Sequence, residues 1–169
     1  MIEEIKTRRS IRRYKQYEIP TEVVNKIIQA GRFAPSGKNK QPWKFIVYGG
    51  DAKRNLLAKM EAGLQRELSG KAFLPDSAYG LPDAGNTLQI MREAPTLVVV
   101  MNPYGKSPFE QITVDERVTE IVDALSIGAA IENMLLEAER LGIGTLWIGN
   151  TFFAYPELAE FVKEPGQLV

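Results

Sequence analysis

The sequence has 169 residues, of which 44% are hydrophobic and 25% charged, which is typical of one globular domain. It contains no Cys and no His, which excludes disulfides, Ser-His-Asp and Cys-His catalysis, and metal centres that need Cys or His ligands. The formal net charge is zero, but residues 1–54 carry 13 Lys or Arg against 5 Asp or Glu, so this part should contact an anion: a nucleotide phosphate, nucleic acid or the acidic part of a second copy.

The N-terminal part predicts two helices with a basic segment between them. Residues 2–7 favour a short helix, and a second one opens at Pro20, which suits a first helical turn. If the segment between them is helical, Arg8 and Arg12 lie on one side. Convergent guanidinium groups suit a phosphate, although a solvated basic turn or a nucleic-acid contact would use the same residues. The candidate phosphate ligands are Arg8, Arg9, Ser10 and Arg12.

A polar loop over residues 31–41 leads into a predicted strand at 43–48. Amide side chains both donate and accept hydrogen bonds, and glycine allows close backbone approach, so the loop suits the edge of a planar heterocycle such as a flavin. An ordinary polar loop before a strand is the alternative. The candidate ligands are Ser36, Gly37, Asn39 and Gln41.

The middle of the chain predicts a helix at 51–68 capped by Asp51, then a strand at 96–101. The continuous apolar character of that strand indicates burial on both faces. Residues 69–88 and 102–113 are rich in Gly and Pro and are predicted to be irregular. The first of these stretches is expected to form a mobile cover with one helical turn.

The longest helical pattern runs from residue 114 to about 141 and is ended by Gly142. Its middle is apolar on nearly all sides, which predicts a helix deep in the core or across a subunit interface. A strand at 145–148, a short helix at 155–162 and the start of a strand at 167–169 follow. The strand at 145–148 ends in glycine, which would let backbone N–H groups point at a ligand, but its pattern alone favours a core strand and a turn.

Several common sites are missing. The sequence has no GxGxxG, no GxxxxGK[ST], no carboxylate pair suited to acid–base catalysis and no Asp-rich metal loop, so no metal is predicted. It also has no apolar run of 18 residues and no signal-peptide core, so we expect a cytoplasmic protein without a membrane span. No repeat or linker interrupts residues 1–169, which are predicted to form a single domain.

Residues 8–14, 34–43 and 141–149 together, in this order and spacing, resemble the nitroreductase family of FMN-dependent oxidoreductases. The resemblance covers about residues 2–162. It implies an α+β sandwich in which helices flank a central, mostly antiparallel sheet. It also implies an obligate homodimer with FMN bound at the subunit interface.

The resemblance assigns roles to individual residues. The implied phosphate and ribityl contacts are Arg8, Arg9, Ser10 and Arg12. The residues that would approach the flavin ring from the other subunit are Pro35, Ser36, Gly37 and Asn39, with Gln41 supporting their loop. Ile148 and Gly149 would present backbone near flavin N5, and Asn86 would reach the pyrimidine edge of the ring. No side chain is assigned a catalytic role, because flavin N5 carries the hydride.

The function implied by this resemblance is a ping-pong exchange. NADH or NADPH delivers a hydride to FMN, and a nitroaromatic, quinone or enone is then reduced in the same pocket. Three alternatives remain open: a specialised flavin enzyme such as a dehalogenase, a flavin-binding or sensing protein with little turnover, and a basic nucleic-acid binder. The last is disfavoured because the chain carries no known nucleic-acid module.

Overall fold

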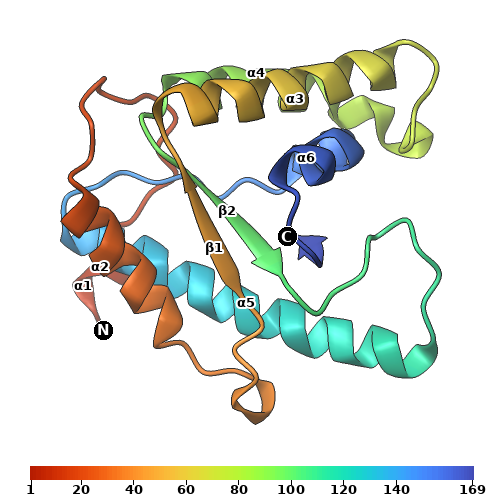
Figure 1. Ribbon diagram of the computed structural model, residues 1–169. Helices are drawn as coiled ribbons and strands as arrows, with labels where there is room; N and C mark the ends of the chain where they lie inside the picture. Colours follow the sequence, from red (N-terminus) through yellow and green to blue (C-terminus); the bar gives the residue numbers. More distant parts are fainter.

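A three-stranded antiparallel sheet in the order β1-β2-β3 forms the middle of the molecule (Figure 1). The structure is a computed structural model that describes residues 1–169. Strand β1 (Lys44–Tyr48) pairs with β2 (Leu97–Asn102) in a register that runs from Lys44 opposite Met101 to Tyr48 opposite Leu97. Strand β3 (Gln167–Leu168) pairs with the end of β2. The strands predicted in these three regions are confirmed.

Helices cover the sheet on two sides, so the fold is the predicted α+β sandwich around an antiparallel sheet (Figure 1). In Figure 1, α3, α4 and α6 lie on one side of the sheet, and α2 and α5 lie on the other. The α-helices are α1 (Glu3–Thr7), α2 (Thr21–Arg32), α3 (Gly50–Leu68), α4 (Leu81–Glu93), α5 (Val114–Arg140) and α6 (Tyr155–Val162). Short 3-10 helices are η1 (Gly37–Asn39), η2 (Pro75–Gly80) and η3 (Asn150–Ala154).

Strand β2 contacts a core on each of its faces. Met101 belongs to the main core, which α3, α4 and α6 supply. Val100 points the other way and packs against Ile127 and Ile131 of α5. This alternation is the expected consequence of successive strand side chains pointing to opposite faces. Both faces of β2 therefore contact apolar side chains, but residues 97–100 are only half-buried, so the predicted burial on both faces is found only in part.

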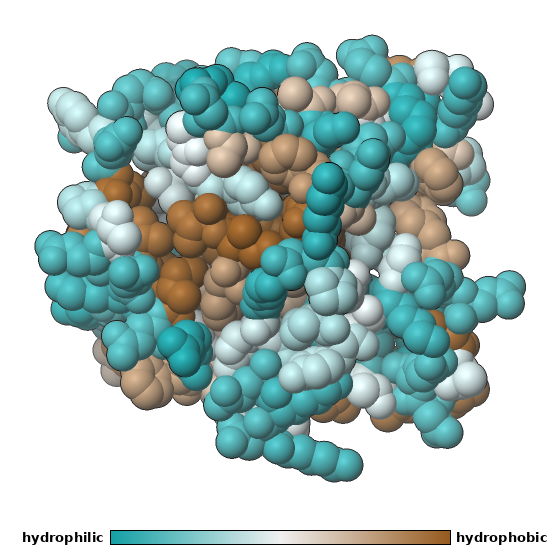
Figure 2. All heavy atoms as spheres, in the orientation of Figure 1, coloured by the Kyte–Doolittle hydropathy of each residue, from teal (hydrophilic) through white to brown (hydrophobic).

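A mostly apolar cavity of about 620 Å³ lies beside β2. Ile28 of α2, Leu135 of α5 and Leu146 line it together with β2 itself. Figure 2 shows apolar side chains gathered in the middle of one face, between hydrophilic surfaces. Residues 145–148, predicted as a strand, form only an isolated bridge at Thr145, because the cavity separates them from β2 and leaves them no ladder partner.

Two further predictions about local structure were wrong. Residues 81–93 form the helix α4 rather than an irregular cover, because Pro82 lies in the first turn, where a missing N–H costs nothing. Ala84, Leu88 and Met91 then bury one face of this helix. Asp51 does not cap α3: Gly49 is the N-cap residue, and Asp51 lies in the first turn, where it pairs with Arg54.

Helix α5 begins with a capping box and then separates two environments. The Thr113 hydroxyl accepts a hydrogen bond from the Glu116 N–H, while the Glu116 carboxylate accepts one from the Thr113 N–H. One face of α5 is buried against α2 and β2. The opposite face is apolar and exposed, with Leu125 at 72% exposure; its residues are Val114, Val118, Ile121, Val122 and Leu125. This helix matches its predicted extent.

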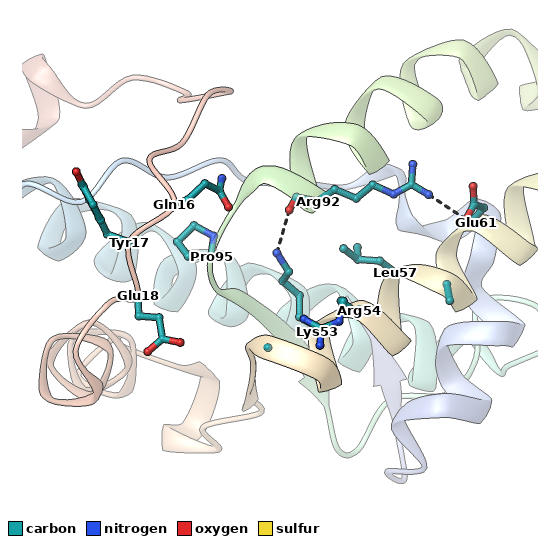
Figure 3. A pocket seen from close by; sticks show the side chains of 11 residues that line it. Gln16, Tyr17, Glu18, Lys53, Arg54, Leu57, Glu61, Arg92 and Pro95 are labelled. Carbon is teal, nitrogen blue, oxygen red and sulfur yellow. Dashed lines mark hydrogen bonds and ion pairs between the residues drawn. The ribbon is translucent and has the colours of Figure 1, made fainter.

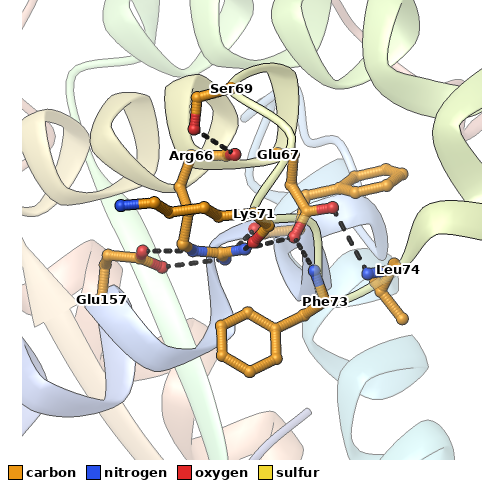
Figure 4. Close-up of polar contacts among 8 residues, drawn as sticks. Arg66, Glu67, Ser69, Lys71, Phe73, Leu74 and Glu157 are labelled. Atoms are coloured by element: carbon orange, nitrogen blue, oxygen red, sulfur yellow. Dashed lines mark hydrogen bonds and ion pairs between the residues drawn. The ribbon is translucent and has the colours of Figure 1, made fainter.

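A charged cluster joins α3 to α6 (Figure 4). The Arg66 guanidinium donates to Glu157 at 2.7 Å and to the Phe153 carbonyl at 2.9 Å, and it also pairs with Glu67. Glu67 is only 5% exposed and accepts hydrogen bonds from the N–H groups of Phe73 and Leu74. Burial opposes ionisation of Glu67, but these donors together lower its pKa. The cluster therefore anchors the segment after α3.

None of the helices combines the length and the apolar character that a bilayer crossing requires.

Candidate functional site

The basic segment leaves α1 in an extended conformation. Arg8 ends the helix with φ −49° and ψ 132°, so the helical arrangement considered for Arg8 and Arg12 does not form. Ser10 bridges to Thr145, and the Ile11 N–H donates to the Thr145 carbonyl at 2.8 Å. Because side chains alternate along an extended backbone, Arg8, Ser10 and Arg12 still share one side.

The guanidinium groups of this segment have no carboxylate partner. None of the ion pairs in the structure involves Arg8, Arg9 or Arg12. Arg9 donates only to the backbone carbonyls of Lys6 and Arg8, and Arg12 only to that of Ser10, at 3.4 Å. These cations therefore keep donors for an anion from solution.

Neighbouring Tyr14 closes the segment. Its hydroxyl donates to the Ile11 carbonyl at 2.7 Å. Burial raises the pKa of Tyr14, and the positive charge of Arg12 opposes that rise. The phenol therefore stays a neutral hydrogen-bond donor at neutral pH.

The amide-rich loop adopts a strained backbone around η1. Lys38, Asn39 and Gln41 all have positive φ, between 51° and 55°, a region that L-residues other than Asn rarely occupy. The Ser36 hydroxyl accepts a hydrogen bond from the Gln41 N–H at 2.9 Å. The Gln41 amide nitrogen donates to the Asn39 side-chain oxygen at 3.2 Å. This leaves the Ser36 hydroxyl hydrogen, Asn39 Nδ2 and Gln41 Oε1 free for a ligand.

Helix α5 holds this loop at three neighbouring positions. A Cβ on Gly37 would lie 2.5 Å from Val122 Cγ1, so only glycine allows this approach. The Gly37 N–H donates to the Ser126 hydroxyl at 3.1 Å. Lys40 pairs with the buried carboxylate of Asp123 at 2.6 Å.

The two candidate groups occupy separate places along α5 (Figure 1). The loop contacts Val122 and Ser126, whereas α1 lies near the end of the helix, where Glu4 is close to Arg140. Ser126 and Arg140 are 14 residues apart, or ~21 Å along the helix axis. Within one subunit the structure therefore does not bring the guanidinium groups and the ring-contact loop together.

The remaining candidates lie on the other side of the sheet from the loop's anchor. Ile148 packs against the main core, and Gly149 is exposed with open space where a Cβ would stand. Asn86 is exposed on α4 rather than on an irregular segment. Asn150 contacts the same helix, because its amide nitrogen donates to Asp83 and Thr87. Its side-chain oxygen is buried without a partner.

A polar cleft of about 540 Å³ opens between α3 and the segment after Tyr14 (Figure 3). Lys53 donates there to the carbonyls of Arg92 and Ala94, and burial lowers the pKa of its amine. Arg92 pairs with Glu61 at 2.9 Å. These charges are satisfied by one another and by backbone groups, so the cleft offers fewer free donors than the basic segment.

Sequence reasoning missed Lys40, Asp123 and Ser126 as parts of the site. The available signal was a pair of polar residues three positions apart in a stretch of the helix, residues 121–131, that is otherwise apolar. That spacing places Asp123 and Ser126 on one face of α5. Nothing in the sequence indicated which loop this face would contact.

Comparison with known proteins identifies the chain's relatives. The sequence model of the nitroreductase family matches residues 5–169. A protein from Archaeoglobus fulgidus, named provisionally as an NADH dehydrogenase/NAD(P)H nitroreductase, is 35% identical over 148 residues, covering 86% of this chain and 64% of the relative. A similar relative from Methanothermobacter thermautotrophicus is covered over 60% of its length, so the chain spans less than two thirds of these relatives.

Two solved structures share the fold. An FMN-dependent nitroreductase from Clostridium difficile has a TM-score of 0.65 and 26% identity, and the match covers 98% of this chain and 79% of the other. The FMN-dependent nitroreductase NfnB from Mycobacterium smegmatis, in complex with NADPH, has a TM-score of 0.73, 17% identity and coverages of 98% and 82%.

Proposed function

Because the chain belongs to the nitroreductase family, we propose that it is an FMN-dependent oxidoreductase that uses NADH or NADPH to reduce small electron-poor molecules. Nitroaromatics, quinones and enones form the acceptor class. The observation that carries this proposal is the cluster of guanidinium groups without carboxylate partners, at the segment that the family resemblance assigns to the cofactor phosphate. Two solved relatives are described as FMN-dependent nitroreductases, one of them in complex with NADPH, which supports the choice of cofactor and donor.

The basic segment suits a phosphomonoester. Arg8, Ser10 and Arg12 share one side of an extended backbone, and their guanidinium groups and hydroxyl can converge on one anion. Arg9 adds positive charge from the other side. Tyr14 and the bridge to Thr145 hold the segment in place, so the phosphate would meet a preorganised set of donors.

The loop at η1 suits the edge of the flavin ring. Ser36 and Asn39 offer free donors, and Gln41 offers a free acceptor, which fits the alternating donors and acceptors of a pyrimidine edge. Pro35 and Gly37 shape the loop so that its backbone can approach the ring. On the other side of the sheet, the open space at Gly149 leaves its backbone accessible. Ile148 precedes it in the chain, and Asn86 is exposed on helix α4.

We propose that a second copy of the chain completes the site. The separation of the two candidate groups along α5 means that one subunit would supply the phosphate contacts and its partner the ring contacts. The exposed apolar face of α5, which includes Ile121 and Leu125, supports such an interface, because a contiguous apolar helix face favours burial against a partner. Leu125→Lys should then convert the dimer to monomer in size-exclusion chromatography, whereas Lys59→Glu on α3 should not.

The chemistry that FMN supplies when bound is two-electron exchange, in which a hydride is taken from the nicotinamide and then passed to the acceptor. The protein's residues bind and orient the reactants. Arg8 and Arg12 would hold the phosphate, and the loop at residues 36–41 would contact the edge of the ring. This scheme requires no side-chain acid, because water can supply the protons.

Fluorescence titration with FMN tests the proposed site. Each charge-assisted contact to the phosphate is worth ~1.5–3 kcal/mol, so losing two of them in Arg8→Ala/Arg12→Ala should lower the affinity for FMN at least about 100-fold. Arg32→Ala, which removes an exposed cation of α2, is the matched control and should bind normally. Equal affinity of the double variant and wild type would show that the basic segment is not the phosphate site.

A further inference from the structure

We propose that Asp123 of α5 is a positioning residue that, through its ion pair with Lys40, holds the loop at residues 36–41 in the shape that receives the cofactor ring. This inference rests on the proposed function, and it assigns to a buried helical carboxylate a role that the family resemblance did not include. Asp123 would touch neither cofactor nor substrate. It would act through the loop alone.

The loop cannot be expected to hold this shape by itself. Three of its non-glycine residues, Lys38, Asn39 and Gln41, occupy the left-handed region, which costs free energy in each case. Its internal hydrogen bonds join residues within the strained turn. Two are from the Gln41 N–H to the Ser36 hydroxyl and between the two amides, and two more run from the N–H groups of residues 39 and 40 to the carbonyls three positions earlier. Such a conformation persists only where surrounding structure fixes it.

Helix α5 provides that fixation at two side chains three positions apart. Ser126 accepts from the Gly37 N–H at the start of the loop, while its own hydroxyl donates to the Val122 carbonyl at 2.8 Å. Asp123 binds Lys40 near the end of the loop at 2.6 Å. Lys40 lies between Asn39 and Gln41 in the chain, so fixing its side chain restrains the backbone from which both amides project.

The ion pair is built into the protein. The Asp123 side chain is 4% exposed and that of Lys40 is 31% exposed. The same carboxylate oxygen also accepts from Asn102 Nδ2 at 3.3 Å, so the carboxylate is oriented from β2 as well. The Lys40 ammonium lies 4.8 Å from the centre of the Tyr104 ring, which adds a cation–π contact on its other side.

Loss of the ion pair should therefore release the loop before it affects the rest of the fold. Ligand affinity falls in proportion to the fraction of molecules in the binding-competent shape. If that fraction drops to about one tenth in Asp123→Asn, the apparent Kd for FMN rises about tenfold. The loop should also become accessible to trypsin at Lys38 and Lys40, with no cofactor present.

The test combines both readouts on the full chain. Asp123→Asn should be cleaved in the loop at least about tenfold faster than wild type under native conditions, and its Kd for FMN should rise about tenfold. Glu132→Gln, which removes an exposed carboxylate from the same helix, should match wild type in both. Lys40→Arg should retain affinity, Lys40→Met should lose it, and Lys40→Met/Asp123→Asn should bind no worse than either single variant.

The positioning role of Asp123 can be refuted by these measurements. Unchanged cleavage at Lys38, the site that both variants keep, and unchanged FMN affinity in both Asp123→Asn and Lys40→Met would overturn the inference. If Asp123→Asn fails to fold, Lys40→Met alone decides, because Lys40 is partly exposed on the loop. If wild-type protein does not bind FMN, the proposed function fails; faster loop cleavage in Asp123→Asn would then still support the positioning role for the loop itself.

Discussion

Replacing Arg66 by Met should destabilise the protein far more than the same replacement at an exposed arginine that has a single ion-pair partner. The change removes the hydrogen bonds to Glu157 and to the Phe153 carbonyl, and it leaves the carboxylate of Glu67 buried without its cation. Breaking a buried pair from one side costs about 3–5 kcal/mol, and we expect about 3 kcal/mol because the Arg66 side chain retains 17% exposure.

The matched control is Arg92→Met, which removes the pair with Glu61. Both partners of that pair are about half exposed, at 42% and 50%, so we expect a cost below about 1 kcal/mol. Arg66→Met/Glu67→Gln should recover part of the loss of Arg66→Met, since the stranded charge is also removed.

Urea unfolding at pH 7, followed by tryptophan fluorescence at one protein concentration, measures the difference. With an m-value of about 2 kcal/mol/M, the midpoint of Arg66→Met should fall by about 1.5 M. Protein concentration must be fixed because self-association would stabilise the folded state. A midpoint for Arg66→Met no lower than that of Arg92→Met would refute the reasoning about the buried carboxylate.

Three further changes have defined outcomes. Gly63→Ala should lower the free energy of unfolding in urea by about 1–3 kcal/mol, because the new Cβ would lie 2.3 Å from the Cβ of Ala154. At Gly85 a Cβ would meet open space, so Gly85→Ala should not destabilise the protein. Equal effects of the two variants would contradict the close packing at Gly63. Thr113→Ala should lower the free energy of unfolding by about 1 kcal/mol through loss of the α5 cap, and an unchanged urea midpoint would show that this cap does not stabilise the protein. The pKa of Glu67 is lower in the folded than in the unfolded protein, so its carboxylate stabilises the fold at pH values above the unfolded pKa of about 4.3, and this stabilisation is lost as the pH falls further. The difference in unfolding free energy between wild type and Glu67→Gln should therefore shrink below that pH. A difference that stays constant would contradict a lowered pKa for Glu67.

The elements predicted correctly are those whose pattern is local. The apolar run at 97–101 and the long helix ended by Gly142 each carry their own periodicity and boundary, so both could be placed from the sequence. Helix α4 was missed because Pro82 and Gly85 were interpreted as helix breakers. Packing of Leu88 and Met91 outweighs the cost of the glycine, and proline is harmless in the first turn.

The parts of the site that could not be predicted depend on distant contacts. The strand expected at 145–148 has suitable residues, but strand formation requires a neighbouring ladder, and that neighbour is absent beside Leu146. The anchoring of the loop depends on Lys40 and Asp123, which are 83 residues apart in the chain. The sequence shows that Asp123 is a charged residue in the mostly apolar middle of a helix, but it does not show which group pairs with it.

Anaerobic visible spectroscopy of the purified chain loaded with FMN tests the central proposal most directly. We expect flavin absorption bands that bleach when NADH or NADPH is added and return when a nitroaromatic or quinone follows. Bands that do not bleach with either nicotinamide would contradict the proposed oxidoreductase activity and favour a flavin-binding role. A protein that takes up no FMN at all would contradict the proposed cofactor site itself.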